Sequence, residues 1–225
     1  EETSISIRYF SIGVIILIFA PPLFENDHYR YIWEGKVILN GENPYITAPN
    51  STLLDYIKFE KKDLIGFPQL TTIYPPLALT WFSIGAFFNF TGAMITLKLM
   101  NSILVFYFFK FMSSYKVNAL HLILIFPFLQ KEFISSIHID LFASSFLFFS
   151  FWTFTRSRTI RANPIFFNLF SFWTKFLSLL IIPIFFLAQN KEQRYKKSTL
   201  LAILSIPIGL ILFFYLFVKD FDLLL

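Results

Sequence analysis

Uncharged apolar runs alternate with short charged connectors along most of the chain. Residues 9–24 carry no charge, and they become long enough to cross a bilayer when residues 5–7 join them. Residues 94–109 form a second predicted span, although Lys98 lies inside it. Residues 73–88 are short and carry two prolines near their start, which predicts a helix that does not cross. Further apolar runs follow at residues 117–129, 141–154, 165–173, 176–188 and 200–218.

The composition of the chain, taken with this pattern, indicates its fold class. Hydrophobic residues make up 56% of the 225-residue chain, which contains 33 phenylalanines. A bilayer covers so much apolar surface once helices have satisfied their own backbone groups. We therefore predict an all-α, polytopic transmembrane helical bundle that forms a single domain over residues 1–225. Because the chain begins without Met and ends directly after an apolar run, we expect it to be incomplete at both ends.

The charged residues orient the predicted bundle. The net charge is +5, but the basic residues lie mainly in short connectors, which indicates topology and gives no reason to expect nucleic acid. The connectors that we place in the cytoplasm contain Lys110, Lys116, Arg156, Arg158, Arg161, Lys191, Arg194, Lys196 and Lys197 against one acid, Glu192. Residues 25–74 then become a long first extracytoplasmic loop carrying interfacial helices. Residues 131–140, Lys175 and residues 219–222 lie on the same side. The absence of cysteine excludes disulfides and thiol catalysis.

The start of this loop, residues 24–45, carries the strongest candidate chemistry. Asn26 or Asp27 is a good helix N-cap and Asn40-Gly41 a good stop, so we predict a helix over residues 28–39. Helical geometry places two sets of side chains on opposite sides. Asp27, Arg30, Tyr31 and Glu34 share one side, and Tyr29, Ile32, Trp33 and Leu39 share the other. We expect the apolar side to rest in the membrane interface and the polar side to face a cavity.

Two interpretations of this helix remain open. In one, Asp27 only caps the helix, and Arg30 and Glu34, four residues apart, form an ordinary surface pair. In the other, the same groups belong to a catalytic site, which Glu25 joins from just before the helix.

A second charged cluster occupies residues 130–140. A solvated loop accounts for Lys131 and Glu132, whereas His138 and Asp140 lie next to an apolar run, where ionisable groups usually pair or line a cavity. Asp140 is equally well explained as a helix cap or as a site residue. The chain has no tight metal-ligand spacing and no phosphate-binding loop, so we expect neither a bound metal nor another cofactor.

Four segments resemble the membrane glycosyltransferases of the GT-C superfamily, particularly bacterial and archaeal polyprenyl-phosphate-dependent mannosyltransferases. They are ENDHYRYIWEGKVILNGENPY (25–45), TTIYPPLA (71–78), KEFISSIHIDLFA (131–143) and WTKFLSLLIIP (173–183). The resemblance implies that Asp27 is the catalytic base, with Glu25 as its neighbour. It also implies a polyprenyl-phosphate sugar donor and a site facing away from the cytoplasm of a bacterial or archaeal cell. Related transferases often have a lysine before the paired prolines, where this chain has Tyr74.

The resemblance implies a multi-pass enzyme that moves a hexose, most simply mannose, to a glycan or lipid acceptor with inversion. Arg30 and Lys175 are expected to meet the leaving phosphate, because fixed cations stabilise developing negative charge. The remaining expected substrate-binding residues are Tyr31, Glu34, Tyr74, His138 and Asp140. A transporter or flippase for a lipid-linked or anionic substrate is the alternative.

Overall fold

The computed structural model describes residues 2–22, 25–114, 130–155, 170–171 and 174. Every regular element in these ranges is helical, which confirms the all-α prediction for the described part of the chain. The longer helices are α1 (Glu2–Phe19), α2 (Asp27–Leu39), α3 (Pro76–Ala86), α4 (Phe90–Ser114) and α6 (Asp140–Thr155). Three short elements are η1 (Thr52–Leu54), η2 (Lys62–Leu64) and η3 (Lys131–Ser135), of which η3 is a turn of π-helix.

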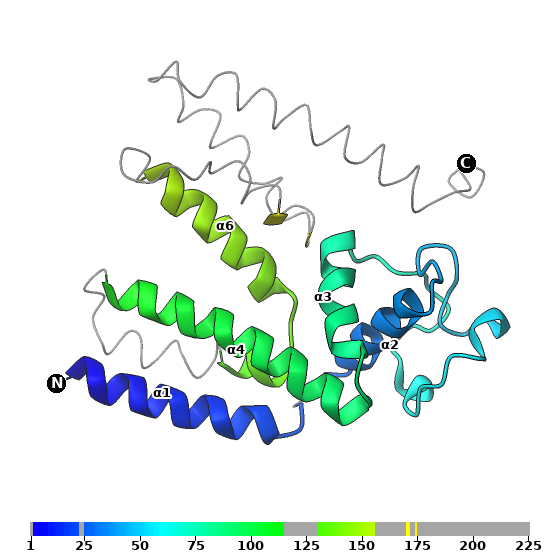
Figure 1. The fold of residues 1–225 in the computed structure, drawn as a ribbon, viewed down its shortest axis with the longest axis horizontal. Helices are drawn as coiled ribbons and strands as arrows, with labels where there is room; N and C mark the ends of the chain where they lie inside the picture. Colours follow the sequence, from blue (N-terminus) through cyan, green and yellow to red (C-terminus); the bar gives the residue numbers. More distant parts are fainter. Residues whose placement is uncertain (1, 23–24, 115–129, 156–169, 172–173, 175–225) are drawn as a thin grey trace, which may run out of the picture.

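Helices α1 and α4 run side by side (Figure 1). Buried Ile18 and Val105 pack between them, together with Ile134 and Leu141 from the segment that follows. Helix α1 ends at Phe19, just before two prolines that cannot continue it. Within α4, residues Phe90–Tyr107 form the one helix of the described ranges that is long and apolar enough to cross a membrane. The runs predicted at 117–129, 165–173, 176–188 and 200–218 lie outside the described residues, apart from isolated positions.

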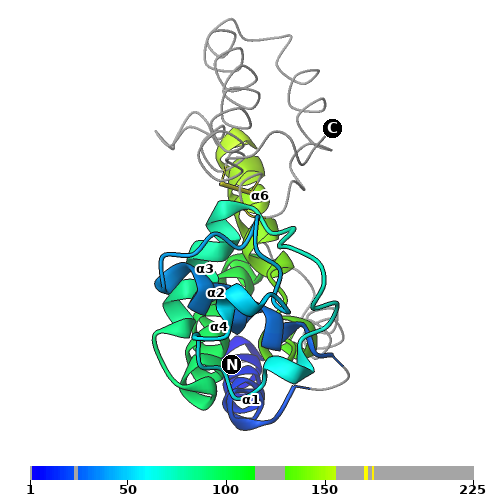
Figure 2. The ribbon, with the colours of Figure 1, turned by 90° about the vertical axis from the view of Figure 1, so that its right-hand side faces the viewer.

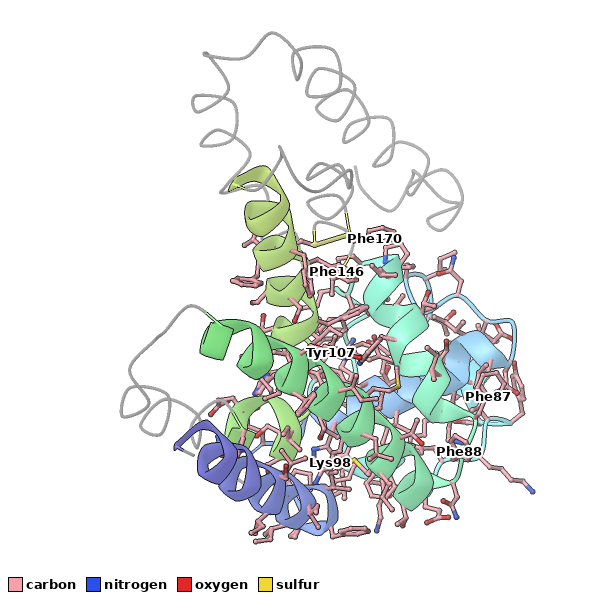
Figure 3. The ribbon with its side chains drawn as sticks, turned by 60° about the vertical axis from the view of Figure 1, so that its left-hand side comes forward. Phe87, Phe88, Lys98, Tyr107, Phe146 and Phe170 are labelled. Atoms are coloured by element: carbon pink, nitrogen blue, oxygen red, sulfur yellow. The ribbon has the colours of Figure 1, made fainter. Side chains whose placement is uncertain are left out.

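A buried lysine joins α1 to α4. The predicted span does contain Lys98, and this side chain is only 1% exposed. Its Nζ donates hydrogen bonds to the backbone oxygens of Leu17 and Ala20, at the end of α1, and Figure 3 shows it on α4 beside α1. Cations are favourable at a helix C-terminus, where carbonyl groups lack partners within the helix. Lys98 therefore satisfies the last turn of α1.

Helices α2 and α3 form a layer across the ends of α1 and α4 (Figure 1). Figure 2 looks onto this end, where α2, α3 and the loop between them lie in front. Tyr31 stacks on Phe82 with ring centroids 4.5 Å apart, and both rings are buried. The helices approach closely at Gly35, where an added Cβ would lie 2.6 Å from the backbone oxygen of Phe82.

The helix predicted over 28–39 is confirmed almost to the residue, but its surroundings differ from the expectation. Ile32 and Trp33, which were expected to rest among lipid headgroups, are 0% and 1% exposed. Trp33 packs with Leu54, Ile57 and Ile65. Because the chain after α2 folds back over this helix, protein covers the apolar side that was expected to rest in the membrane interface.

The second charged cluster leads into α6, which begins at Asp140 and matches the predicted run 141–154. Helix α3 is only 11 residues long, in agreement with the prediction of a short helix there. Helices α2 and α3 and the η3 turn, which come from two separate segments of the chain, therefore all contact α4.

Candidate functional site

The structure brings the two charged clusters of the sequence into contact. His138 Nε2 contacts the carboxylate of Glu25 and lies 3.4 Å from Glu132 Oε2. On the other edge of the ring, His138 Nδ1 lies 4.0 Å from Asp140 Oδ2. More than a hundred residues separate Glu25 from these partners along the chain. The charge pattern assigned residues 25 and 131–140 to the same face, and in the structure they are in contact.

An unusual backbone path presents His138 to this cluster. After the π-helical turn, the backbone N–H groups of Ser136 and His138 donate to the backbone oxygens of Lys131 and Glu132, at 3.1 and 3.3 Å. Ile137 has a φ of 60°, a left-handed conformation that is strained for a β-branched residue. Its side chain is 2% exposed, so apolar burial offsets part of this strain.

Carboxylates dominate the charge of the cluster. Glu25, Glu132 and Asp140 surround His138, and all three are partly exposed. Lys131 Nζ pairs with Glu132 Oε1 at 2.6 Å. The negative charge of Glu25 and Glu132 beside His138 favours a further cation at this point.

Asp27 lies in the first turn of α2 and does not cap it. Asn26 occupies the N-cap position, and its side chain makes no capping hydrogen bond. The Asp27 carboxylate is half-buried, and no hydrogen bond or ion pair joins it to another described side chain. A negative charge at this end of a helix is favourable. Among the described residues, the Asp27 carboxylate therefore neither caps α2 nor forms an ion pair.

Two tyrosines, the buried Tyr31 and the partly buried Tyr74, adjoin Asp27. The hydroxyls of Tyr31 and Tyr74 are hydrogen-bonded to each other. Burial raises the pKa of both hydroxyls, and the negative charge of Asp27 raises both further. Asp140 also raises the pKa of Tyr31, by a smaller effect. Asp27 and Asp140 therefore act on the same tyrosine, which links the α2 residues to the His138 cluster.

Arg30 and Glu34 form a buried pair rather than a surface one. Arg30 Nε donates to Glu34 Oε1 at 2.8 Å, and Thr72 Oγ1 donates to Glu34 Oε2 at 2.6 Å. The other four Arg30 N–H groups donate to the backbone oxygens of Gly66, Phe67, Leu70 and Thr71. Burial raises the pKa of Glu34, and its bonds to Thr72 and Arg30 oppose that shift. All five guanidinium N–H groups are engaged, so Arg30 holds the loop in place and has no donor left for a phosphate.

His28 lies against the rings of Tyr29 and Phe90. Burial lowers its pKa to about 4, and the nearby Lys98 ammonium contributes. His28 is therefore neutral at pH 7, in a packing position.

The remaining site residues differ in how the structure bears on their predicted roles. Lys175 lies outside the described residues, so its expected phosphate contact stays a prediction. Glu132 was assigned to a solvated loop, but it joins Glu25 and His138. Thr72 was missed altogether, because an isolated threonine in a loop carries no pattern that predicts a buried carboxylate partner.

Comparison with known proteins adds one result to this geometry. No curated protein and no solved structure matched the chain. Residues 4–190 match the family model described as alpha-(1->6)-mannopyranosyltransferase, N-terminal domain. This match extends over most of the 225 residues and includes both charged clusters. The chain therefore belongs to the MptA_B family of mannosyltransferases, which is of the GT-C type.

Proposed function

We propose that this mannosyltransferase takes mannose from a polyprenyl-phosphate donor and transfers it, with inversion, to a glycan or lipid acceptor outside the cytoplasm. Asp27 is the general base in this proposal. The observation that supports it most strongly is the half-buried Asp27 carboxylate, which neither caps α2 nor pairs with a described side chain. It lies beside buried Tyr31 and partly buried Tyr74, at the end of the bundle where the two charged clusters meet.

The chemistry requires one proton transfer and one displacement. Asp27 accepts the proton of the acceptor hydroxyl as that oxygen forms a bond to the anomeric carbon of mannose. The bond between that carbon and the phosphate oxygen breaks on the opposite face, and the polyprenyl phosphate leaves with the electron pair. Tyr31 and Tyr74 keep their protons, because burial raises the pKa of each hydroxyl. Tyr74, the less buried of the two, can therefore hold a sugar or phosphate oxygen as a hydrogen-bond donor, while the hydroxyl of Tyr31 is bonded to Tyr74 and positions it.

The leaving phosphate needs a positive partner. We assign this role to Lys175, and Arg30 becomes a positioning residue that holds residues 66–71 beside α2. We predict that Lys175→Ala weakens the use of the lipid donor. The apparent KM for the polyprenyl-phosphate sugar measures this effect, and an unchanged KM would remove Lys175 from the phosphate site.

A lipid donor reaches this end of the molecule through the membrane. Apolar side chains that are at least 55% exposed line one side of α1 (Ile12, Ile15, Ile16 and Phe19), and Ile103 and Tyr107 on α4 are as exposed. We propose that these faces meet lipid and that the complete bundle is multi-pass. Phe87 and Phe88, labelled in Figure 3, are exposed at the turn before α4 and suit the boundary of the bilayer.

A transfer assay separates this proposal from a transporter. Membranes or proteoliposomes containing the chain are supplied with polyprenyl-phosphate mannose labelled in the sugar and with a mannoside acceptor. The proposal predicts labelled acceptor and released polyprenyl phosphate. Movement of intact labelled donor across the membrane, without cleavage, would support the transporter and overturn the enzyme assignment.

A further inference from the structure

We propose that Glu25, Glu132 and His138 bind a divalent transition-metal ion of the Mn²⁺ or Zn²⁺ class. Each residue offers one ligand atom, and these atoms all lie within 4.8 Å of one another. Sequence analysis disfavours a metal here, because Glu25 lies more than a hundred residues before Glu132 and His138 and the three ligands follow no short metal-binding spacing.

The ligand set suits this class of metal. Carboxylate oxygens favour Mn²⁺, imidazole nitrogen favours Zn²⁺ and its neighbours, and a mixed set accepts both. The distance of 3.4 Å between His138 Nε2 and Glu132 Oε2 is close to the separation of two ligand atoms that each lie about 2.1 Å from one metal. His138 Nε2 is shielded from solvent, yet it has no hydrogen bond to any described residue. This nitrogen is thus directed at the two carboxylates without the geometry of an ordinary hydrogen bond.

The groups around the ligands support the same assignment. Metal-binding histidines usually turn their second ring nitrogen toward a carboxylate, and His138 Nδ1 faces Asp140 at 4.0 Å. Glu132 uses its other oxygen, Oε1, to pair with Lys131 at 2.6 Å, which leaves Oε2 directed at His138. The strained conformation of Ile137 fixes the backbone just before the histidine. A bound metal would also be stabilised by the negative charge of Glu25 and Glu132.

Three protein ligands leave coordination positions open. If the proposed function is correct, those positions would accept oxygens of the leaving phosphate, beside the Asp27 carboxylate. This part rests on the proposed function, whereas the binding of a metal does not.

Titration of the purified full chain with Mn²⁺, followed by electron paramagnetic resonance of free and bound ion, tests binding directly. We expect one bound Mn²⁺ per chain, displaced by Zn²⁺. Glu132→Gln and His138→Gln should each weaken binding by at least about 10-fold, since loss of even an outer partner has that effect. Asp55→Asn, at an exposed acid paired with Lys62 elsewhere in the loop, should leave the affinity unchanged.

Two results would overturn the metal site. The first is a wild-type chain that binds no Mn²⁺. The second is binding that survives both substitutions in chains that unfold at the wild-type temperature. Asp27→Asn keeps the three ligands, so it should bind Mn²⁺ normally while losing transfer. The metal site and the proposed function can therefore fail independently.

Discussion

Arg30 is the residue whose role changed most between sequence and structure. Its spacing from Glu34 predicted a pair on an exposed face, but nothing local indicates that residues 66–71 turn their carbonyl groups toward it. Asp27 shows the opposite case, because the sequence left cap and site as equal choices and the observed N-cap is Asn26. Sequence spacing predicts contacts between side chains one helix turn apart, but it does not predict contacts between segments that are distant in the sequence.

Replacing Arg30 should lower the stability of the folded chain strongly. Arg30→Gln removes the partner of a buried carboxylate and releases four backbone oxygens, so we expect a loss of about 3–5 kcal/mol in unfolding free energy. Asp55→Asn disrupts a pair whose acid is 64% exposed, and it should cost less than about 1 kcal/mol. Unfolding in detergent, followed by tryptophan fluorescence, measures both variants. Equal effects would contradict the buried role of Arg30.

His28 predicts a pH dependence of stability. The pKa of His28 is about 4 in the folded chain, whereas that of a solvent-exposed imidazole in the unfolded chain is 6.5. Between pH 4 and pH 6.5 the unfolded chain therefore binds a proton at His28 that the folded chain does not bind. The stability linked to neutral His28 is complete above pH 6.5 and declines as the pH falls toward 4. In His28→Gln, the loss of stability between pH 7 and pH 5 should be smaller than in the wild type. Identical pH profiles for the two proteins would show that the imidazole is not protected from protons.

At the scale of elements, the hydrophobic pattern and the helix stop signals predicted where helices begin and end. They did not predict whether protein or lipid covers the apolar side of a helix. Asn40-Gly41 ends α2 as expected: Gly41 has a φ of 78°, and Asn40 Nδ2 donates to the backbone oxygen of Lys36. The amphipathic pattern of α2 does not say whether its apolar side meets lipid or protein. The side chains that cover it, Leu54, Ile57 and Ile65, lie in a loop without regular periodicity.

The contact between α2 and α3 is predicted to be sensitive at Gly35. An alanine Cβ there would lie 2.6 Å from the backbone oxygen of Phe82, so the helices must separate. We expect Gly35→Ala to lower the unfolding free energy by about 1–3 kcal/mol. Gly66→Ala is the matched control, because its Cβ would meet no atom closer than 3.6 Å. An unfolding temperature equal to the wild type for Gly35→Ala would show that the helices are not tightly apposed.

At the scale of the whole molecule, the proposed topology places α2, the loop and the His138 cluster on the outer face. The chain has no cysteine, so single introduced cysteines report sidedness without background. A membrane-impermeant maleimide should label Lys58→Cys in intact cells. Lys196→Cys, in a connector that we assign to the cytoplasm, should react only after permeabilisation. The reverse pattern would place the site on the cytoplasmic face and exclude the proposed donor geometry.

The most direct test of the central claim is sugar transfer by Asp27→Asn. The asparagine keeps the size of the side chain and removes its ability to accept a proton at neutral pH. The variant should accumulate in membranes to the wild-type level and unfold at the wild-type temperature. When these membranes are supplied with polyprenyl-phosphate mannose and acceptor, we expect the rate of mannose transfer to fall by at least about 100-fold, which is the lower end of a general-base contribution. Transfer by folded Asp27→Asn at the wild-type rate would contradict the assignment of Asp27 as the base.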